Sequence, residues 1–259
     1  MPTTPVDGPS LSGGTPLPVR PGKIIAVHLS YASRADQRGR RPDHPSYFFK
    51  PSSSIAVSGG VVERPAGTEL LAFEGEIALV IGTPARRVGM DRAWSHVGWV
   101  TAANDLGLYD LRVNDRGSNV RSKGGDGFTP IGPALIDART VDPAGLRVRA
   151  WVNGRLAQDD TSAGLLFPFA QLVADLSQHL TLESGDVILT GTPAGSTVIV
   201  PGDVVEVQVD AAGGPSTGRL VTTVVQGDVP FDASLGSLPS VDDHQRAEAW
   251  GVPTAQDPA

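Results

Sequence analysis

The sequence predicts a mixed fold that is mainly β, with a few short helices. Short runs of apolar and β-branched residues recur along the chain between glycines and prolines, a pattern typical of strands joined by turns. Only two segments have the character of helices, and no repeat of about 20–50 residues is visible. The chain has 259 residues, enough for one large domain or two small ones.

We expect three parts along the chain. Residues 1–22 are dense in proline, glycine, serine and threonine and are predicted to form a flexible arm. Residues 23–231 contain the strand-like and helix-like segments and are expected to form the main domain. Residues 232–259 are polar again, and we expect a tail that is either loose or docked on a partner subunit.

The first half of the main domain is predicted to contain five strands and one helix. The stretch 77–81 is apolar and rich in β-branched residues and ends on Gly82, which indicates a buried strand. The stretch 47–50 is an aromatic strand that Pro51 stops. The other expected strands are 23–27, 55–57 and 99–103, and the expected helix is 91–97.

The second half begins with residues 106–128, which are polar and rich in glycine. A loop of that length is usually functional or disordered. Residues 146–152 alternate as a strand does, and Asn153-Gly154 is a strong signal for a two-residue hairpin. Residues 167–180 have apolar residues at helical spacing and predict an amphipathic helix. Further strands are expected at 187–190, 204–209 and 220–225.

Composition excludes several classes of protein. Hydrophobic residues make up 40% and charged residues 19%, and no apolar run approaches the roughly 20 residues of a membrane span. The absence of cysteine excludes disulfides, thiolate metal sites and a cysteine nucleophile. A net charge of -7 without a basic block argues against nucleic acid or an acidic membrane as a partner. No charged-then-apolar signal opens the chain, so we expect a cytoplasmic protein.

Two carboxylates flank the start of the strand at 77–81. Side chains alternate along a strand, so Glu74 and Glu76 share one face, and Gly75 leaves the other face open to close approach. Neighbouring carboxylates repel each other and are costly to bury. A hard divalent cation such as Mg²⁺, Mn²⁺ or Ca²⁺ would remove both costs. The alternative is a solvated strand entrance with both glutamates in water.

Asp105 is the third carboxylate of interest, at the end of the strand 99–103 and next to Asn104. An acidic residue in this position either caps the following turn or faces a site. With Glu74 and Glu76 it would supply three oxygen ligands and leave about three octahedral positions for water or substrate. Such an open metal site would be catalytic in kind.

Lysines and one glycine-rich turn are further candidates for binding an anion. The chain has only three lysines, and Lys50 and Lys123 lie beside polar segments where arginine would be the default. Taken alone, either lysine is better explained by chance retention than by a functional role. The turn Gly191-Thr192-Pro193-Ala194-Gly195 follows a strand and either presents backbone N–H groups to an anion or is simply a tight turn.

Residues 34–42 carry four arginines and form either a mobile flap or an ordinary solvated loop. The five histidines lack the spacing of a metal motif, and neither a G-x-S-x-G nor a G-x-G-x-x-G motif is present.

Several short motifs follow one another along residues 23–225. In order, they are Phe73-Glu74-Gly75-Glu76, Ala103-Asn104-Asp105, Lys123 with Asp126, Pro130 with Gly132-Pro133, Val152-Asn153-Gly154, residues 185–195 and Pro201-Gly202-Asp203. Together these motifs resemble the fumarylacetoacetate hydrolase superfamily. Within the superfamily, the loop 121–130 and the short link 192–203 most resemble the homoprotocatechuate-pathway decarboxylase/isomerase.

The resemblance implies a β-roll core in a catalytic domain over residues 23–231, commonly in a homodimer. It also implies Mg²⁺ or Mn²⁺ held by Glu74, Glu76 and Asp105. Lys123 and the Thr192 turn would contact the carboxylate or oxo group of a small-molecule substrate.

Two departures from the family pattern bear on the reaction. Hydrolytic members carry an Asn-Tyr-x-x-His segment with a nearby Glu that activates water, whereas this chain has Arg34 and Gln37 in those places. Neither side chain is a credible general base at neutral pH. Tyr109 stands where relatives have an arginine, and Arg112 is a candidate replacement for that cation.

The preferred hypothesis is a metal-dependent enzyme that decarboxylates or isomerises a 2-oxo (or enol) acid through a metal-stabilised enolate. The alternatives are hydrolytic C–C cleavage of an acylpyruvate or fumarylacetoacetate-like diketo acid, with Asp36 or a metal-bound hydroxide as base, and a non-catalytic oxo-acid binder. The candidate residues are Lys123, Arg34 and Asp36 for catalysis, Thr192, Lys123, Arg112, Tyr109 and Lys50 for substrate, and Glu74, Glu76 and Asp105 for metal.

Overall fold

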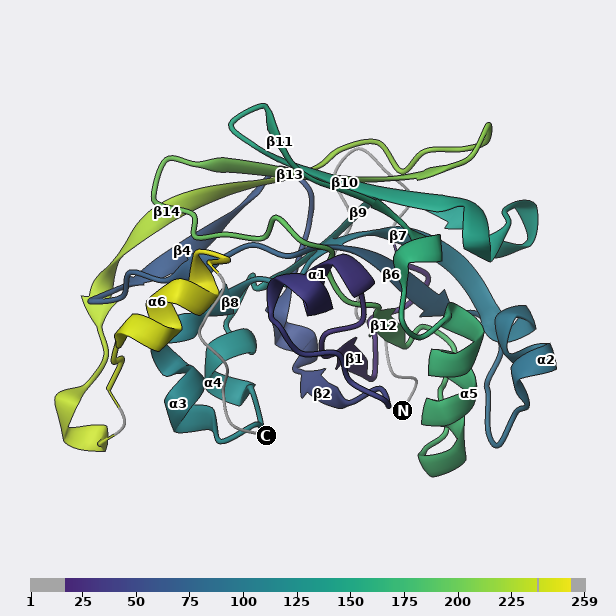
Figure 1. Ribbon diagram of the computed structural model, residues 1–259, viewed down its shortest axis with the longest axis horizontal. Helices are drawn as coiled ribbons and strands as arrows, with labels where there is room; N and C mark the ends of the chain where they lie inside the picture. The colour runs from purple at the N-terminus through teal and green to yellow at the C-terminus, as the bar shows by residue number, and fades with distance from the viewer. Residues whose placement is uncertain (1–16, 237, 253–259) are drawn as a thin grey trace, which may run out of the picture.

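Residues 17–236 and 238–252 are described by the computed structural model, shown in Figure 1. Residues 1–16 of the expected arm lie outside the described residues. Leu17 is buried among core residues of the larger sheet. Within the described ranges, every helix is too short or too polar to span a bilayer.

The larger sheet provides the strands that carry the site. Its order is β2 (Tyr47–Lys50), β1 (Ile24–Val27), β12 (Val187–Leu189), β6 (Gly75–Ile81), β7 (Val97–Asn104), β9 (Thr129–Asp137) and β3 (Ile55–Ala56). Strands β1 and β12, and also β3 and β9, pair in parallel, and the other pairs are antiparallel. In the β6–β7 pair, Gly75 lies opposite Asn104, so the beginning of one strand meets the end of the other.

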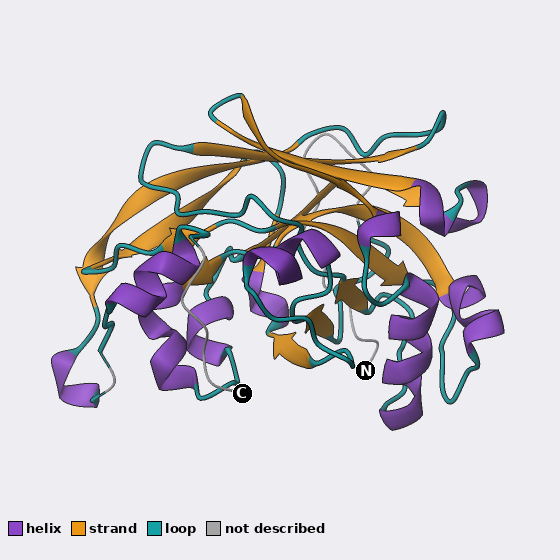
Figure 2. Ribbon diagram, in the orientation of Figure 1, coloured by secondary structure: helices purple, strands orange, loops and turns teal. Residues whose placement is uncertain are grey.

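A second sheet packs over the first and forms a separate layer, as Figure 2 shows. Its order is β11 (Arg155–Thr161), β10 (Leu146–Val152), β13 (Val204–Ala211), β14 (Leu220–Pro230) and β4 (Gly60–Ala66). A small two-stranded sheet pairs β5 (Leu71–Ala72) with β8 (Gly107–Leu108). The mainly β prediction is confirmed, and the two curled sheets form the body of the molecule.

Short helices lie around the ends of the sheets (Figure 1). They are α1 (Ala32–Gln37), α2 (Met90–Ala93), α3 (Arg112–Asp115), α4 (Val120–Lys123), α5 (Phe169–His179) and α6 (Asp243–Ala249). Helices α2 and α5 lie together at one end, and α3, α4 and α6 gather at the other. The amphipathic pattern at 167–180 is confirmed as α5, whose apolar face is buried.

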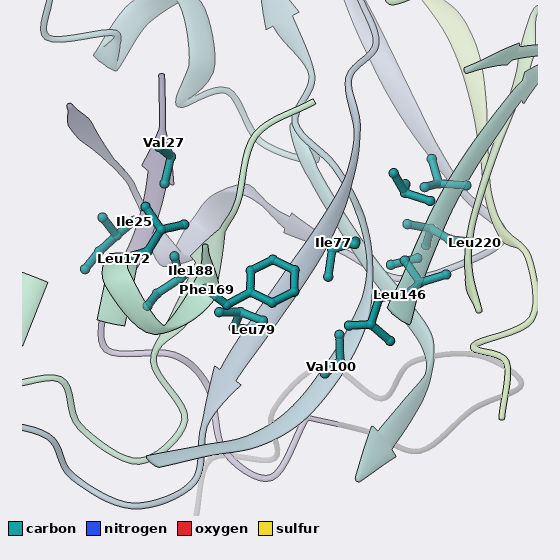
Figure 3. Packing of buried hydrophobic residues seen from close by; sticks show 14 of the residues in the cluster. Ile25, Val27, Ile77, Leu79, Val100, Leu146, Phe169, Leu172, Ile188 and Leu220 are labelled. Atoms are coloured by element: carbon teal, nitrogen blue, oxygen red, sulfur yellow. The ribbon is translucent and has the colours of Figure 1, made fainter. Parts of the chain in front are cut away.

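The core fills the space between the sheets and under α5. All seven residues of β6 are buried, whereas burial alternates along β13 because only one face of that strand packs inward. Figure 3 shows Ile77 and Val100 near Leu146 of the second sheet, and Leu79 near Phe169 of α5. Burying such side chains contributes about 1.5–3 kcal/mol each.

The expected strands are present, and the structure adds several elements. The hairpin at Asn153-Gly154 is confirmed, and both of its residues have positive φ, as a type I′ turn requires. Strands β4 and β9 were not predicted, because each contains proline, which is rare inside strands.

Two loop predictions are wrong. Residues 34–42 were expected to be a flap or loop, but α1 occupies the first part of the segment, and Arg34 and Ala35 on it are buried. Residues 106–128 are not a structureless loop, because they contain β8, α3 and α4. The buried Asp115 organises this segment by accepting hydrogen bonds from the backbone N–H groups of Arg121 and Ser122 and from the Ser122 hydroxyl.

Residues 238–252 of the expected polar tail pack against the main domain of the same chain. Asp242 caps the N-terminus of α6 in a capping box with Gln245. Ala249 is fully buried against an apolar cluster that includes Leu70 and Tyr109.

Candidate functional site

The ends of β6 and β7 bring three acidic side chains together. Glu74 precedes β6, Glu76 lies in it, and Asp105 follows β7. The backbone N–H of Asp105 donates to the carbonyl of Glu74 over 2.8 Å, and the N–H of Glu74 donates to Asn104 Oδ1 over 3.0 Å. One carboxylate oxygen from each acid lies within 4.8 Å of the others, so the three could hold one cation.

The buried Lys50 and the partly buried Lys123 both contact Asp105. Lys123 Nζ donates to Asp105 Oδ2 and to the Asp105 carbonyl, each over 2.9 Å, and also bonds Glu74 Oε2. Lys50 Nζ forms an ion pair with Asp105 Oδ1 and donates to the Phe128 carbonyl over 2.8 Å. Burial by itself would raise the pKa of Asp105, but Lys123 and Lys50 together lower it below the ordinary value.

Glu76 differs from the other two acids in having no cationic partner. It is buried and accepts a hydrogen bond from the Gly191 N–H over 2.7 Å, but no lysine or arginine in the described part of the chain forms an ion pair with it. Burial, followed by the charges of Asp105 and Glu74, raises the pKa of Glu76 well above its usual value. A bound cation would supply the missing positive charge.

Among the buried polar side-chain atoms without a hydrogen-bond partner in the described residues, three belong to Asn104 and to the Ser30-Tyr31 pair that precedes α1, and others lie on β4, β10 and β14. The three are the Ser30 hydroxyl, the Tyr31 hydroxyl and the Asn104 side-chain nitrogen. Asn104 adjoins Asp105, and burial, Asp160 and Glu76 raise the pKa of Tyr31. Because buried polar groups are normally hydrogen-bonded, these atoms indicate that a ligand or water completes the site. An all-oxygen donor set with such surroundings fits Mg²⁺ or Mn²⁺.

The turn at 191–195 closes one side of the cluster. Thr192 Oγ1 donates to the Gly75 carbonyl over 2.9 Å and accepts from Gln158 Nε2 over 2.8 Å, so its hydroxyl is already bonded within the protein. Gln158 also accepts from the Gly75 N–H and donates to the Pro193 carbonyl. Sequence reasoning missed Gln158, because a lone glutamine in a polar strand carries no recognisable signal.

Helix α1 places only one of its two candidate residues near the carboxylates. Arg34 is buried, with Nη2 3.8 Å from Glu74 Oε1, and its Nη1 donates to Gln37 Oε1 over 2.6 Å. Asp36 points away from the site: its side chain is 70% exposed and pairs with Arg41. The structure therefore does not bring the proposed hydrolytic base Asp36 into the site.

Tyr109 and Arg112 lie in a second cluster beside the first. The Arg112 guanidinium is 4.6 Å from the centre of the Tyr109 ring, and Arg38 Nη2 donates to the Tyr109 hydroxyl over 2.8 Å. Glu248 of α6 forms ion pairs with Arg38 at 3.0 Å and with Arg112 at 2.8 Å. Sequence reasoning did not select Arg38 or Glu248, since only the tertiary fold brings the C-terminal segment to this place.

Comparisons with a family model and with curated proteins point to one family. The family model described as fumarylacetoacetate (FAA) hydrolase C-terminal matches residues 23–225. A 4-hydroxyphenylacetate degradation bifunctional isomerase/decarboxylase of Salmonella dublin is 37% identical over 206 residues, which are 79% of this chain and 47% of that protein. The chain thus spans about half the length of this curated relative.

Solved structures agree in fold over most of the chain. The crystal structure of 5-carboxymethyl-2-hydroxymuconate delta-isomerase from Mycobacterium smegmatis matches with a TM-score of 0.74 and 35% identity, covering 82% of each chain. The 2-hydroxyhepta-2,4-diene-1,7-dioate isomerase from Mycobacterium marinum matches with a TM-score of 0.72 and 32% identity, covering 81% of this chain and 77% of that one.

Proposed function

The chain belongs to the fumarylacetoacetate hydrolase family, and from this premise we propose that it is a divalent-metal-dependent enzyme that decarboxylates or isomerises a 2-oxo (or enol) carboxylic acid. The observation that carries the proposal is the convergence of Glu74, Glu76 and Asp105, with Glu76 buried and lacking a cationic partner in the described residues. The isomerase and decarboxylase names of the relatives support the same reaction class.

Glu74, Glu76 and Asp105 would hold the ion, for which Mg²⁺ and Mn²⁺ are the best candidates. When bound, such an ion supplies Lewis-acid stabilisation of the negative charge that builds on the substrate's oxo oxygen. Lys123 ties Glu74 to Asp105 and so keeps two of the ligands in place. Lys50 fixes Asp105 from the other side.

The neighbouring cations would bind and orient the substrate's carboxylate. Lys123 and Arg34 both lie against Glu74, so an acid seated beside the carboxylate cluster would meet their positive charges. Both side chains are largely withdrawn from water, which strengthens their interaction with an anion. Arg112 and Tyr109 would flank the remainder of the substrate.

Decarboxylation or isomerisation is favoured over hydrolysis because nothing on α1 can activate water. Arg34 and Gln37 are hydrogen-bonded to each other, and neither a guanidinium nor an amide accepts a proton from water at neutral pH. Asp36 is exposed and paired with Arg41. Loss of CO₂ needs an acceptor for electrons and a proton for the resulting enolate, and migration of a double bond needs a proton moved from one carbon to another. Neither reaction needs activated water.

Glu76→Gln tests the proposal. We expect this variant to lose bound metal and to lose at least about 100-fold in turnover of 2-oxo acids, because a neutral amide binds a hard cation weakly. Metal analysis and a substrate-panel assay give the two readouts. Glu183→Gln, which alters an exposed ion pair with Lys23, is the matched control and should retain both the bound metal and the turnover of wild type. Full turnover of metal-free wild-type protein would refute the proposal.

Product analysis separates the reaction classes. Release of CO₂ from a 2-oxo acid supports decarboxylation, whereas pyruvate plus a carboxylic acid from an acylpyruvate would show hydrolysis. Tight binding of oxalate without turnover of any substrate would instead identify a binding protein.

A further inference from the structure

Glu248 on α6 occupies a position that a ligand's carboxylate could take. Its two carboxylate oxygens bond two different arginines, Arg38 of α1 and Arg112 of α3. Both guanidinium groups lie near the Tyr109 ring, at 5.9 and 4.6 Å from its centre. Two arginines beside an aromatic ring form a typical binding site for a carboxylate. Here the carboxylate belongs to the chain itself.

The arginine pair adjoins the acidic cluster. Arg38 lies one helical turn beyond Arg34, which is 3.8 Å from Glu74. Gln37, between these arginines, donates to the carbonyl of Gly251 over 2.8 Å, so α1 and the C-terminal segment are joined next to the site. A small acid bound at the carboxylate cluster would therefore extend its far end toward Arg38 and Arg112.

Helix α6 is firmly attached at this position. Gln245 Nε2 donates to the carbonyl of Tyr109 over 3.0 Å, and the Ser240 N–H donates to the carbonyl of Asp110 over 2.9 Å. Arg246 makes a two-pronged ion pair with Glu69. The helix lies outside residues 23–225, which the family model matches.

We propose that Glu248 is a specificity-determining residue whose carboxylate fills the seat of a substrate's second carboxylate between Arg38 and Arg112. This inference rests on the proposed function and narrows its substrate class to 2-oxo acids with an uncharged tail. A dicarboxylic acid would place its second negative charge against Glu248, and both nearby guanidinium groups would already be paired. The isomerase from Mycobacterium marinum, by contrast, is named for a dioate.

The test compares two five-carbon acids that differ in the second carboxylate. Wild-type protein with Mg²⁺ should bind 2-oxopentanoate more tightly than 2-oxoglutarate in calorimetric titrations. In Glu248→Gln both arginines lose their ion pair with residue 248, so the affinity for 2-oxoglutarate should rise about tenfold while the affinity for 2-oxopentanoate stays within about twofold. Glu69→Gln, which breaks the other ion pair of α6, is the matched control and should leave both affinities unchanged.

Two further measurements test the role of Glu248 independently. Adding Arg112→Gln to Glu248→Gln should abolish the gain for 2-oxoglutarate. Glutarate, which has no oxo group, should bind Glu248→Gln more tightly than wild type even without metal. If neither protein bound either oxo acid, the proposed function would be wrong. The affinity of Glu248→Gln for glutarate relative to that of wild type would still decide the role of Glu248. The inference would be overturned if the ratio of the affinity for 2-oxoglutarate to that for 2-oxopentanoate were the same in wild type and in Glu248→Gln.

Discussion

Gly75, the first residue of β6, separates Glu74 from Glu76 at a point where the second sheet approaches the backbone. A Cβ at this position would lie 2.9 Å from Gln158 Oε1 and 3.0 Å from the Cβ of Ala150. The sequence alone indicated close approach on the face opposite Glu74 and Glu76, and the structure identifies strands β10 and β11 as the neighbours.

Gly75→Ala should lower the free energy of unfolding by about 1–3 kcal/mol, because an added methyl group forces neighbours in a packed interior to shift. Chemical denaturation of the metal-free protein measures the change. Gly145→Ala is the control, since its added Cβ would meet neighbours only at 3.7 Å, an ordinary contact distance. Equal stability of Gly75→Ala and wild type would show that the second sheet does not press on this residue.

The acidic residues show what a single-residue pattern can reveal. Alternation along a strand predicted that Glu74 and Glu76 share a face, and the structure confirms that they meet Asp105. Asp36 was selected only because it is an acid near the missing dyad, and the helix turns it toward solvent. The direction of a helical side chain depends on which face of the helix packs.

At the scale of elements, β11 and the turn at 191–195 are joined to β6 through one side chain. Gln158 accepts from the Gly75 N–H and donates to Thr192 and to the Pro193 carbonyl. The same turn supplies the Gly191 N–H that bonds Glu76. Its position relative to the carboxylates therefore depends on a strand from the other sheet.

Gln158→Ala should lower the free energy of unfolding by about 2–3 kcal/mol, because it leaves buried backbone groups of Gly75 and Pro193 without partners. It should also weaken metal binding, since the turn that bonds Glu76 loses its anchor. Denaturation and metal titration measure the two effects. Gln208→Ala, on the partly exposed side of β13, should change stability by less than about 1 kcal/mol and keep metal affinity. Unchanged metal affinity in Gln158→Ala would refute the link.

Elements with a clear periodicity were predictable, and those held by tertiary hydrogen bonds were not. The strands at 77–81 and 204–209 and the helix at 167–180 follow from the order of apolar residues alone. The helices within 106–128 are four residues each and depend on the buried Asp115, whose partners lie six and seven residues away. Such short helices have too few internal hydrogen bonds to be stable by local preference.

At the scale of the whole molecule, the site joins segments from most of the chain. Glu74, Asp105, Lys123, Gly191 and Glu248 are spread over more than half of the sequence, yet they surround one region. Two buried carboxylates and the partly buried Glu74 face two lysines there, so without a bound cation the negative charges outnumber the positive ones. Binding a cation should stabilise the whole fold.

Mg²⁺ or Mn²⁺ at about 100 times its dissociation constant should stabilise the folded protein by about 2.7 kcal/mol, since the unfolded chain lacks the site. Thermal melting with and without the ion measures this effect. Chelation should reverse it, and Glu76→Gln should show little of it because one ligand is lost. A wild-type melting temperature that does not respond to either metal would count against the site.

By itself, the sequence determined the mainly β architecture, the family and the three carboxylates, because strand alternation and local motifs are written in neighbouring residues. Only the tertiary structure decided that Lys50 and Lys123 share Asp105, that Asp36 is exposed and paired with Arg41, and that the C-terminal helix pairs Glu248 with Arg38 and Arg112. Those contacts join residues distant along the chain, and their geometry follows from how the two sheets and the helices pack.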